Sequence, residues 1–274
     1  MRKFRAPVNR ILILWLCGLL PLNALSAKNR GHLIAEADGS SFRIIERTGV
    51  EQLAPVGSLL KPFAALYLLE HGVNATQEIF CPALRKQTAK LRCWTPDGHG
   101  AMNLAKALVQ SCNYYFLSQF RGRNLEAYEK WLRANFEWPE HVHIRNPVNV
   151  YGFDLEFGIE AEKLLTMYTK LLQMAAAGNT NANLITRALA NVCEGTLADF
   201  CRELGKKPHY RLVLGKTGTV TEGGRNFGVV LLLVDHVPLK RRTLIICYEK
   251  GKMGSQVAMN ALKLLKDKSG QKRN

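Results

Sequence analysis

The chain has 274 residues, of which 47% are apolar, and it carries a formal net charge of +16. This composition excludes a largely disordered protein, and the sequence has no internal repeat or low-complexity tract. A basic chain suits anionic partners such as envelope polymers, membrane surfaces or nucleic acids. Because no nucleic-acid-binding motif is present, we expect no nucleic-acid partner.

Residues 1–27 have the pattern of a secretory signal peptide. A positively charged start precedes an apolar run at 11–22, and small residues follow at 24–27. The basic residues are Arg2, Lys3, Arg5 and Arg10. The apolar run is too short for a comfortable transmembrane helix. We therefore expect export to the periplasm or cell envelope, with cleavage near Ser26 or Ala27; the alternative is an uncleaved anchor that associates with the envelope membrane.

Export would place the cysteines in an oxidising compartment, where they can form disulfides. Cys81 and Cys93 bracket a turn-rich loop, and we predict a disulfide between them. Cys193 and Cys201 would lie about 12 Å apart along a straight helix, which is too far for a disulfide. They could pair only if the chain bends at residues 195–196.

Strand patterns open the chain and helical patterns follow. Two strand-like runs, at 32–37 and 42–47, flank Asp38-Gly39, and this dipeptide is a hairpin signal. Helical spacing begins at Ser58 and continues to His71. Further helical patterns follow at 103–110, 113–120, 125–136 and 164–177, and a capping-box start lies at 196–199.

The pattern changes after residue 210. Apolar, β-branched runs at 211–214, 227–234 and 243–248 predict strands, and a helical pattern at 257–265 closes the chain. The order of strands, helices, strands and helix predicts a mixed α/β (α+β) fold, in which both chain ends build one sheet around an inserted helical region. We expect one domain over residues 28–267, followed by a basic tail at 268–274.

The first of three short motifs is Ser58-Leu59-Leu60-Lys61. A serine hydroxyl becomes a good nucleophile only when a base takes its proton. Residues three apart share a helix face, so Lys61 would lie beside Ser58. Lysine can act as that base if burial or a nearby cation lowers its pKa. We therefore expect Ser58 to be the nucleophile and Lys61 the general base.

The second motif, Ser111-Cys112-Asn113, falls between two helical patterns. A loop there can point two side chains into a cleft, with Ser111 relaying a proton and Asn113 holding a substrate amide. We expect the Cys112 thiol to be free. Residues 81–100, which precede this region, are expected to be loop.

The third motif, Lys216-Thr217-Gly218-Thr219, follows the predicted strand at 211–214. A glycine there lets a ligand backbone lie against the strand edge. Lys216 and Thr217 can bind a substrate carboxylate, and Lys216 also supplies the cation that Lys61 needs beside it. The backbone N–H groups of Ser58 and Thr219 would then form an oxyanion hole.

Together the three motifs resemble those of penicillin-binding protein transpeptidase domains, a resemblance that covers roughly residues 30–267. It is carried by residues 54–66, 111–116 and 215–219, and by the Gly195-Thr196 pair upstream. The resemblance implies a five-stranded antiparallel sheet flanked by helices beside an all-helical subdomain, a fold shared with serine β-lactamases. It also implies peptidoglycan stem peptides ending in D-Ala-D-Ala as substrates and acylation by β-lactams.

These observations favour an exported DD-transpeptidase or DD-carboxypeptidase. The alternatives are a serine β-lactamase and a sensor that binds β-lactams or muropeptides without turnover. The deacylation pattern of class A β-lactamases is absent, and none of Glu137, Glu156, Glu160 or Glu162 lies in it. We expect no cofactor and no metal, because His141-x-His143 has no third ligand in view.

Overall fold

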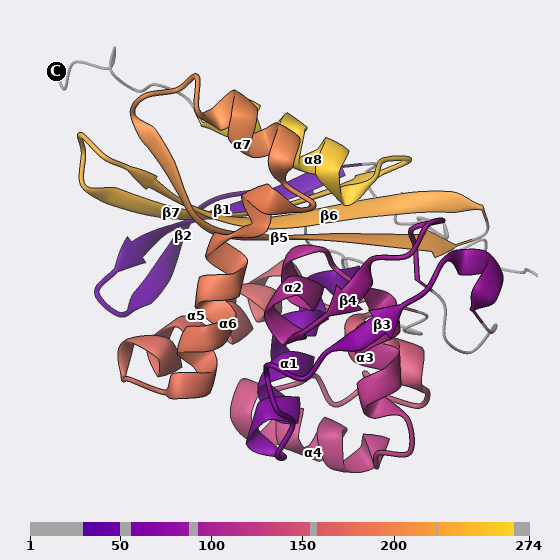
Figure 1. Ribbon diagram of the computed structural model, residues 1–274. Helices are drawn as coiled ribbons and strands as arrows, with labels where there is room; N and C mark the ends of the chain where they lie inside the picture. The colour runs from indigo at the N-terminus through magenta and orange to yellow at the C-terminus, as the bar shows by residue number, and fades with distance from the viewer. Residues whose placement is uncertain (1–29, 50–55, 88–92, 154–157, 223, 266–274) are drawn as a thin grey trace, which may run out of the picture.

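The computed structural model describes residues 30–49, 56–87, 93–153, 158–222 and 224–265. The predicted leader and basic tail lie outside the described residues. The core element is a five-stranded sheet with the strand order β2-β1-β7-β6-β5, in which every neighbouring pair is antiparallel (Figure 1). The strands are β1 (Arg30–Asp38), β2 (Ser41–Thr48), β5 (Tyr210–Glu222), β6 (Arg225–His236) and β7 (Arg241–Lys250). The expected sheet, built from both chain ends, is confirmed.

Both faces of the sheet are covered. Helices α7 (Ala198–Leu204) and α8 (Gly254–Ala261) lie on one face, and the helical region lies on the other (Figure 1). Along β6, Val230 and Leu232 belong to the core under α7 and α8, whereas Val229 and Leu231 belong to the larger core on the opposite side. This explains why β6 reads as a continuous apolar run rather than an alternating one.

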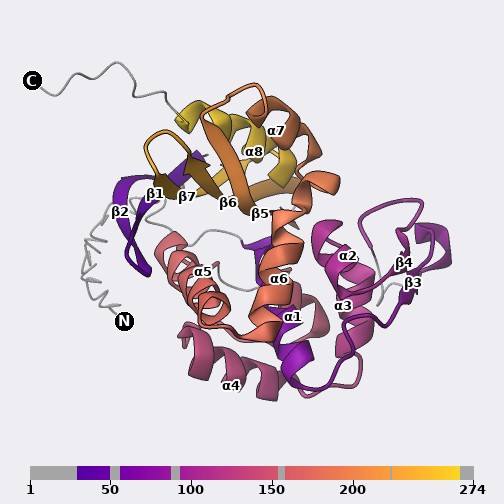
Figure 2. The same cartoon turned by 60° about the vertical axis from the view of Figure 1, so that its left-hand side comes forward.

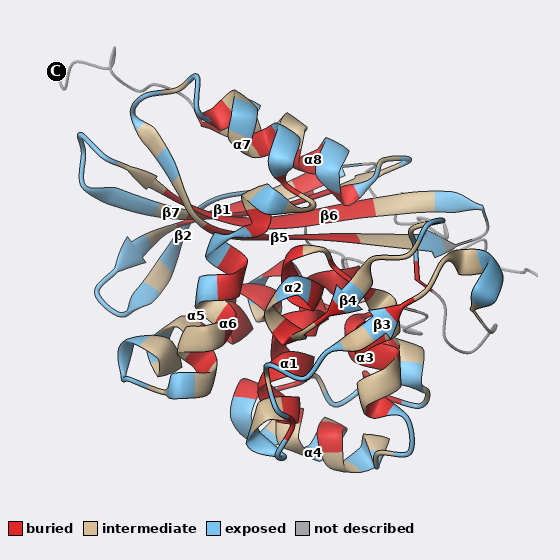
Figure 3. Ribbon diagram, in the orientation of Figure 1, coloured by how far each residue is buried: buried red, intermediate tan, exposed pale blue. Residues whose placement is uncertain are grey.

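The helical region is inserted between β2 and β5 in the sequence (Figure 2). At its centre, α1 (Lys61–Glu70) is largely buried (red in Figure 3), and eight of its ten residues have no more than a small exposed fraction. The other helices are α2 (Leu104–Val109), α3 (Asn113–Phe120), α4 (Leu125–Phe136), α5 (Ala161–Ala176) and α6 (Thr180–Ala190). Among the described residues, no helix has the length and apolar character needed to cross a membrane.

Three features differ from the sequence predictions. The expected loop at 81–100 is closed at its two ends by a small sheet that was not predicted, made of β3 (Ile79–Cys81) and β4 (Gly100–Met102). Helix α6 was not predicted at all. Strand β5 extends to residue 222, because its pairing with β6 continues through the third motif instead of ending before it.

Candidate active site

The three motifs meet where the edge strand β5 lies against the turn that precedes α1. Ser58 lies in a 3-10 turn, η1 (Gly57–Leu60), that leads directly into α1, and Lys61 is the first residue of that helix. Ser111 lies in the short connection between α2 and α3. Lys216 begins the part of β5 that carries the third motif, and all four side chains are buried.

Lys61 is fully buried and contacts the second motif through its ammonium group. Its Nζ donates to the Ser111 carbonyl oxygen and to Asn113 Oδ1, both at 2.6 Å, and reaches Ser111 Oγ at 3.2 Å. The rings of Tyr151 and Phe116 lie beside it, with their centroids 5.3 and 5.7 Å from Nζ. Lys61 is therefore held in one position by three oxygen acceptors and two aromatic side chains.

Burial also changes the acidity of both lysines. Removal from water disfavours the charged ammonium and lowers the pKa of Lys61 to about 7. Burial, and then the charge of Lys61, lower the pKa of Lys216 well below its ordinary value. The structure thus provides the desolvation that the sequence argument required of Lys61.

Ser111 adopts a left-handed backbone conformation, with φ of 54°, which is uncommon for a residue other than glycine. Its hydroxyl oxygen lies 2.8 Å from Lys216 Nζ as well as within reach of Lys61. Lys216 Nζ also donates to the Thr217 carbonyl oxygen at 2.9 Å. Backbone strain of this kind is often found at functional sites, and here it turns the Ser111 hydroxyl between the two lysines.

Ser58 and β5 approach each other closely because of two glycines. A Cβ on Gly218 would lie 2.7 Å from the Val56 carbonyl oxygen and 3.1 Å from the Ser58 nitrogen. A Cβ on Gly57, which has a φ of +45°, would lie 3.1 Å from the Thr219 nitrogen. The backbones of the first and third motifs therefore pack together directly, with the Ser58 and Thr219 nitrogens on that contact.

Thr217 has a partner that its motif alone did not indicate. Its hydroxyl donates to Thr196 Oγ1 at 2.8 Å. The predicted capping box at 196–199 is wrong, because the N-cap of α7 is Leu197 and makes no side-chain cap. The Thr196 hydroxyl is engaged by Thr217 instead. The Gly195-Thr196 pair, noted in the sequence only as a resemblance, thus contacts the third motif.

Trp94 is a further residue that the sequence did not indicate. Its indole Nε1 donates to the Ser111 carbonyl oxygen at 3.1 Å, although the side chain is half exposed. The Ser111 carbonyl therefore accepts hydrogen bonds from both Trp94 and Lys61. No sequence signal connects a tryptophan 17 residues upstream with the second motif.

Two of the four glutamates considered as deacylation bases form ion pairs elsewhere. Glu137 pairs with Lys163 and Lys170, and Glu162 pairs with Arg47. Glu156 lies outside the described residues. No hydrogen bond in the described part of the chain joins Glu137 or Glu162 to the three motifs.

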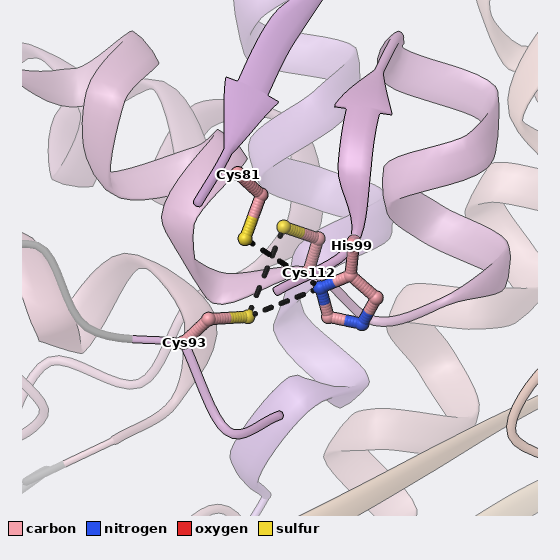
Figure 4. A group of neighbouring side chains, drawn as sticks. All are labelled: Cys81, Cys93, His99 and Cys112. Atoms are coloured by element: carbon pink, nitrogen blue, oxygen red, sulfur yellow. Dashed lines mark hydrogen bonds between the residues drawn. The ribbon is translucent and has the colours of Figure 1, made fainter. Parts of the chain in front are cut away.

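Three cysteines and a histidine gather next to the second motif, and we call them the thiol–imidazole cluster (Figure 4). Its members are Cys81, Cys93, His99 and Cys112. Cys112 is the N-cap of α3 and directly follows Ser111. Hydrogen bonding from Cys112 lowers the pKa of Cys93, with a further contribution from His99, and the same contact together with burial raises the pKa of Cys112.

The predicted disulfide between Cys81 and Cys93 is wrong, because both are free cysteines. The expected free thiol at Cys112 is confirmed. The disulfide joins Cys193 to Cys201 instead. These two residues do not lie on one straight helix, because η4 (Val192–Glu194) ends at Gly195 and α7 starts in a new direction. The bend that the sequence argument required is present.

The exposed His141 and His143 remain outside this site. His143 Nδ1 lies 3.1 Å from Glu129 Oε1, and both histidines are exposed. The half metal site considered at this motif gains no support. The four cluster residues, by contrast, present ligand atoms that lie within 4.8 Å of one another.

Comparisons with known proteins are consistent with the motifs. The profile of the penicillin binding protein transpeptidase domain matches residues 25–175. The peptidoglycan D,D-transpeptidase MrdA of Acinetobacter baumannii is 32% identical over 88 residues. That alignment covers 31% of this chain and 13% of MrdA.

Solved structures with the same fold come from several kinds of protein. The D,D-transpeptidase domain of a peptidoglycan glycosyltransferase from Eggerthella lenta has a TM-score of 0.67 at 12% identity, covering 90% of this chain and 80% of that one. The C-terminal domain of the Bacillus licheniformis BlaR penicillin receptor has a TM-score of 0.65 at 17% identity, covering 89% and 92%. A class D β-lactamase from Sebaldella termitidis has a TM-score of 0.59 at 14% identity, covering 86% and 90%.

Proposed function

Because the chain belongs to the family of penicillin-binding protein transpeptidase domains, we propose that it is a serine DD-transpeptidase or DD-carboxypeptidase that acts on D-Ala-D-Ala peptides of peptidoglycan. We also propose that it works in the periplasm or cell envelope, as its leader-like first 27 residues favour. The observation that best supports this function is the convergence of two buried lysines on Ser111 Oγ.

Acylation begins with the transfer of the Ser58 hydroxyl proton to neutral Lys61, and Ser58 Oγ attacks the carbonyl carbon of the penultimate D-Ala. An ordinary lysine would be protonated near neutral pH and unable to accept this proton. The pKa of about 7 that burial gives Lys61 supports its role as the base. The backbone N–H groups of Ser58 and Thr219 stabilise the oxyanion that forms.

Collapse of this intermediate breaks the peptide bond, and the leaving amine of the terminal D-Ala needs a proton. Ser111 donates its hydroxyl proton to that amine and regains one from Lys61, whose Nζ lies 3.2 Å from Ser111 Oγ. Asn113 holds the substrate amide, and Lys216 and Thr217 bind the terminal carboxylate. The acyl group then passes from Ser58 to an amine of a second peptide or to water.

A serine β-lactamase and a β-lactam sensor remain the alternatives, since the same fold occurs in the class D β-lactamase and in the BlaR receptor. A DD-peptidase, a β-lactamase and a sensor would all form an adduct on Ser58, but they differ in how fast the adduct is released. A β-lactamase releases the adduct rapidly, and a sensor keeps it and transfers no acyl group from a peptide. The engagement of Glu137 and Glu162 elsewhere supports slow release.

Intact-mass spectrometry after exposure to benzylpenicillin tests this proposal. We expect one adduct, located on the peptide that contains Ser58, and its loss in Ser58→Ala. The matched control is Ser255→Ala, which changes an exposed serine on α8 and should leave the adduct in place. An adduct on another residue, or none on folded protein, would refute the assignment of Ser58.

A further inference from the structure

The ligand atoms of the thiol–imidazole cluster have the spacing of a tetrahedral metal site. With Zn–S bonds of about 2.3 Å, two sulfurs on a tetrahedral zinc ion lie about 3.8 Å apart. Cys93 Sγ and Cys112 Sγ are 3.8 Å apart (Figure 4). His99 Nδ1 lies 3.3 Å from Cys93 Sγ and 3.7 Å from Cys81 Sγ. These separations leave room for one ion at the centre of the four atoms.

The donor set points to zinc. Three thiolates and one imidazole form a closed four-coordinate set, which is typical of structural zinc sites, whereas magnesium and calcium prefer oxygen ligands. The three cysteines are buried, with exposed fractions of 1%, 6% and 0% for Cys81, Cys93 and Cys112. None of the three forms a disulfide, although Cys193 and Cys201 of the same chain do. A closed set gives the ion a structural role rather than a catalytic one.

The surroundings of the cluster hold its ligands in place. Gln87 Oε1 accepts from the Cys93 nitrogen at 2.5 Å, while its Nε2 donates to the Pro82 carbonyl oxygen at 2.6 Å. One side chain thus ties together the segments that carry Cys81 and Cys93. Gly98, with a φ of +74°, lets the chain before His99 pass the Cys81 carbonyl oxygen, which a Cβ would approach to 2.4 Å.

The His99 ring is oriented as a metal ligand would be. Its Nδ1 faces the sulfurs, while its Nε2 is buried and has no hydrogen-bond partner among the described residues. Burying an unpaired polar nitrogen costs free energy. A metal bond at Nδ1 would fix the ring proton on Nε2 and would leave that N–H unpaired, so the indication of an ion lies in the orientation of Nδ1 toward the sulfurs.

The cluster is connected to the active site at two points. Cys112 directly follows Ser111, and Cys93 directly precedes Trp94, whose indole donates to the Ser111 carbonyl oxygen at 3.1 Å. An ion that binds both cysteines would therefore fix the residues on either side of that carbonyl. The left-handed conformation of Ser111 needs such support, because it is strained for a residue with a side chain.

We propose that the thiol–imidazole cluster binds one zinc ion, and that this ion holds Ser111 in the conformation in which its hydroxyl meets Lys61 and Lys216. Binding deprotonates the three thiols and releases their protons to solvent. The metal-binding part of this proposal stands on the cluster alone. Only the link to acylation rests on the proposed function.

Metal content of the purified full chain, supplied with zinc and then dialysed, tests the first part. We expect one zinc ion per chain, and about 100-fold or more weaker zinc binding after Cys81→Ala, since even partners of metal ligands contribute 10–100-fold. Cys247→Ala is the matched control, because Cys247 is a buried free cysteine outside the cluster. A native chain without zinc, or a Cys81→Ala variant that retains it, would overturn the site. Recovery of cobalt in place of zinc from an equal mixture of the two ions would overturn the choice of metal, because a thiolate-rich tetrahedral site binds zinc more tightly than cobalt.

A second measurement covers the case in which Cys81→Ala does not fold. Cobalt added to the native chain should give the absorption of tetrahedral Co²⁺ with thiolate ligands, and Cys81→Asp, which keeps a ligand, should retain cobalt with a weaker thiolate band. Octahedral cobalt in the native chain would overturn the proposal.

Penicillin acylation of the zinc-loaded and zinc-free chains tests the link to Ser111. We expect the zinc-free chain to react on the order of 10-fold more slowly, and added zinc to restore the rate. Equal rates in both forms would overturn the link. A chain that holds zinc but is never acylated would refute the proposed function and leave the metal site standing, so the two failures can be told apart.

Discussion

Lys61 and Lys216 direct their ammonium nitrogens at the same oxygen, Ser111 Oγ, at 3.2 and 2.8 Å. Two fully protonated lysines this close in a buried site would repel each other with little water to screen them. Burial lowers the pKa of both lysines, and the charge of Lys61 further lowers the pKa of Lys216. The pair is therefore suited to exchanging a proton through the Ser111 hydroxyl near neutral pH.

The rate of penicillin acylation should rise with pH through about pH 7. Lys61 acts as a base only when neutral, and its pKa of about 7 places that change in this range. Of the groups facing it, the Cys93 and Cys112 thiols favour its protonation, and Lys216 is a buried lysine whose own pKa is lowered by burial and by the charge of Lys61. A fluorescent penicillin followed across this range, with thermal unfolding checked at each pH, measures the effect. A rate that falls as pH rises through 7 would contradict Lys61 as the base.

Gly218→Ala should slow acylation by about 10²-fold, the loss expected when a catalytic group is displaced by about 1 Å. The added Cβ would meet the Val56 carbonyl oxygen at 2.7 Å and the Ser58 nitrogen at 3.1 Å, and both are backbone atoms that cannot move independently. Gly205→Ala is the control, because its Cβ would meet nothing closer than 3.4 Å. Equal acylation rates in both variants would contradict the importance of close packing between β5 and the backbone at Ser58.

Much of the site follows from local sequence. Ser58 and Lys61 are one helical turn apart, so their common location needs no tertiary information. The order of strands and helices was likewise enough to predict the sheet. Strand β5 was predicted too short, because Gly218 and the polar residues around it lack the apolar pattern that indicates a strand, although the pairing with β6 continues through the third motif.

The thiol–imidazole cluster could not be predicted in this way. Its residues come from the end of β3, from a loop, from the residue before β4 and from the N-cap of α3. Their spacing matches no common zinc motif, and two of them were interpreted as a disulfide. Only the packing of the small sheet against α3 brings Cys81 and Cys112 together. The role of Trp94 could not be predicted for the same reason, because its hydrogen bond to Ser111 is a tertiary contact.

The disulfide between Cys193 and Cys201 should stabilise the folded chain by about 2–3 kcal/mol, as loop-closure entropy predicts for a short loop. We expect the Cys193→Ser/Cys201→Ser double variant to unfold at a lower temperature and to bind zinc normally. It should also acylate more slowly, because the bridged turn carries Thr196, which contacts Thr217. Calorimetry and the penicillin assay measure both effects. An unchanged unfolding temperature would contradict the stabilising role.

Release of the penicillin adduct should be much slower than its formation. Acylation needs a nucleophile, a base and an oxyanion hole, but deacylation needs a second base beside the water that attacks the ester. Among the described glutamates, Glu137 is held by two lysines and Glu162 by Arg47. Both are therefore committed to ion pairs away from the three motifs.

General-base catalysis typically contributes 10²–10⁴-fold to a rate, so its absence should leave an adduct that persists long after acylation is complete. Pulse labelling with fluorescent penicillin, followed by an excess of unlabelled drug, measures the release. We expect Glu137→Gln and Glu162→Gln to release the label at the native rate, since neither carboxylate contacts the motifs. Steady hydrolysis of nitrocefin at roughly 10 s⁻¹ or more, an ordinary enzymatic turnover, would contradict slow release and favour the β-lactamase alternative. A glutamine variant that then lost this hydrolysis would identify the base.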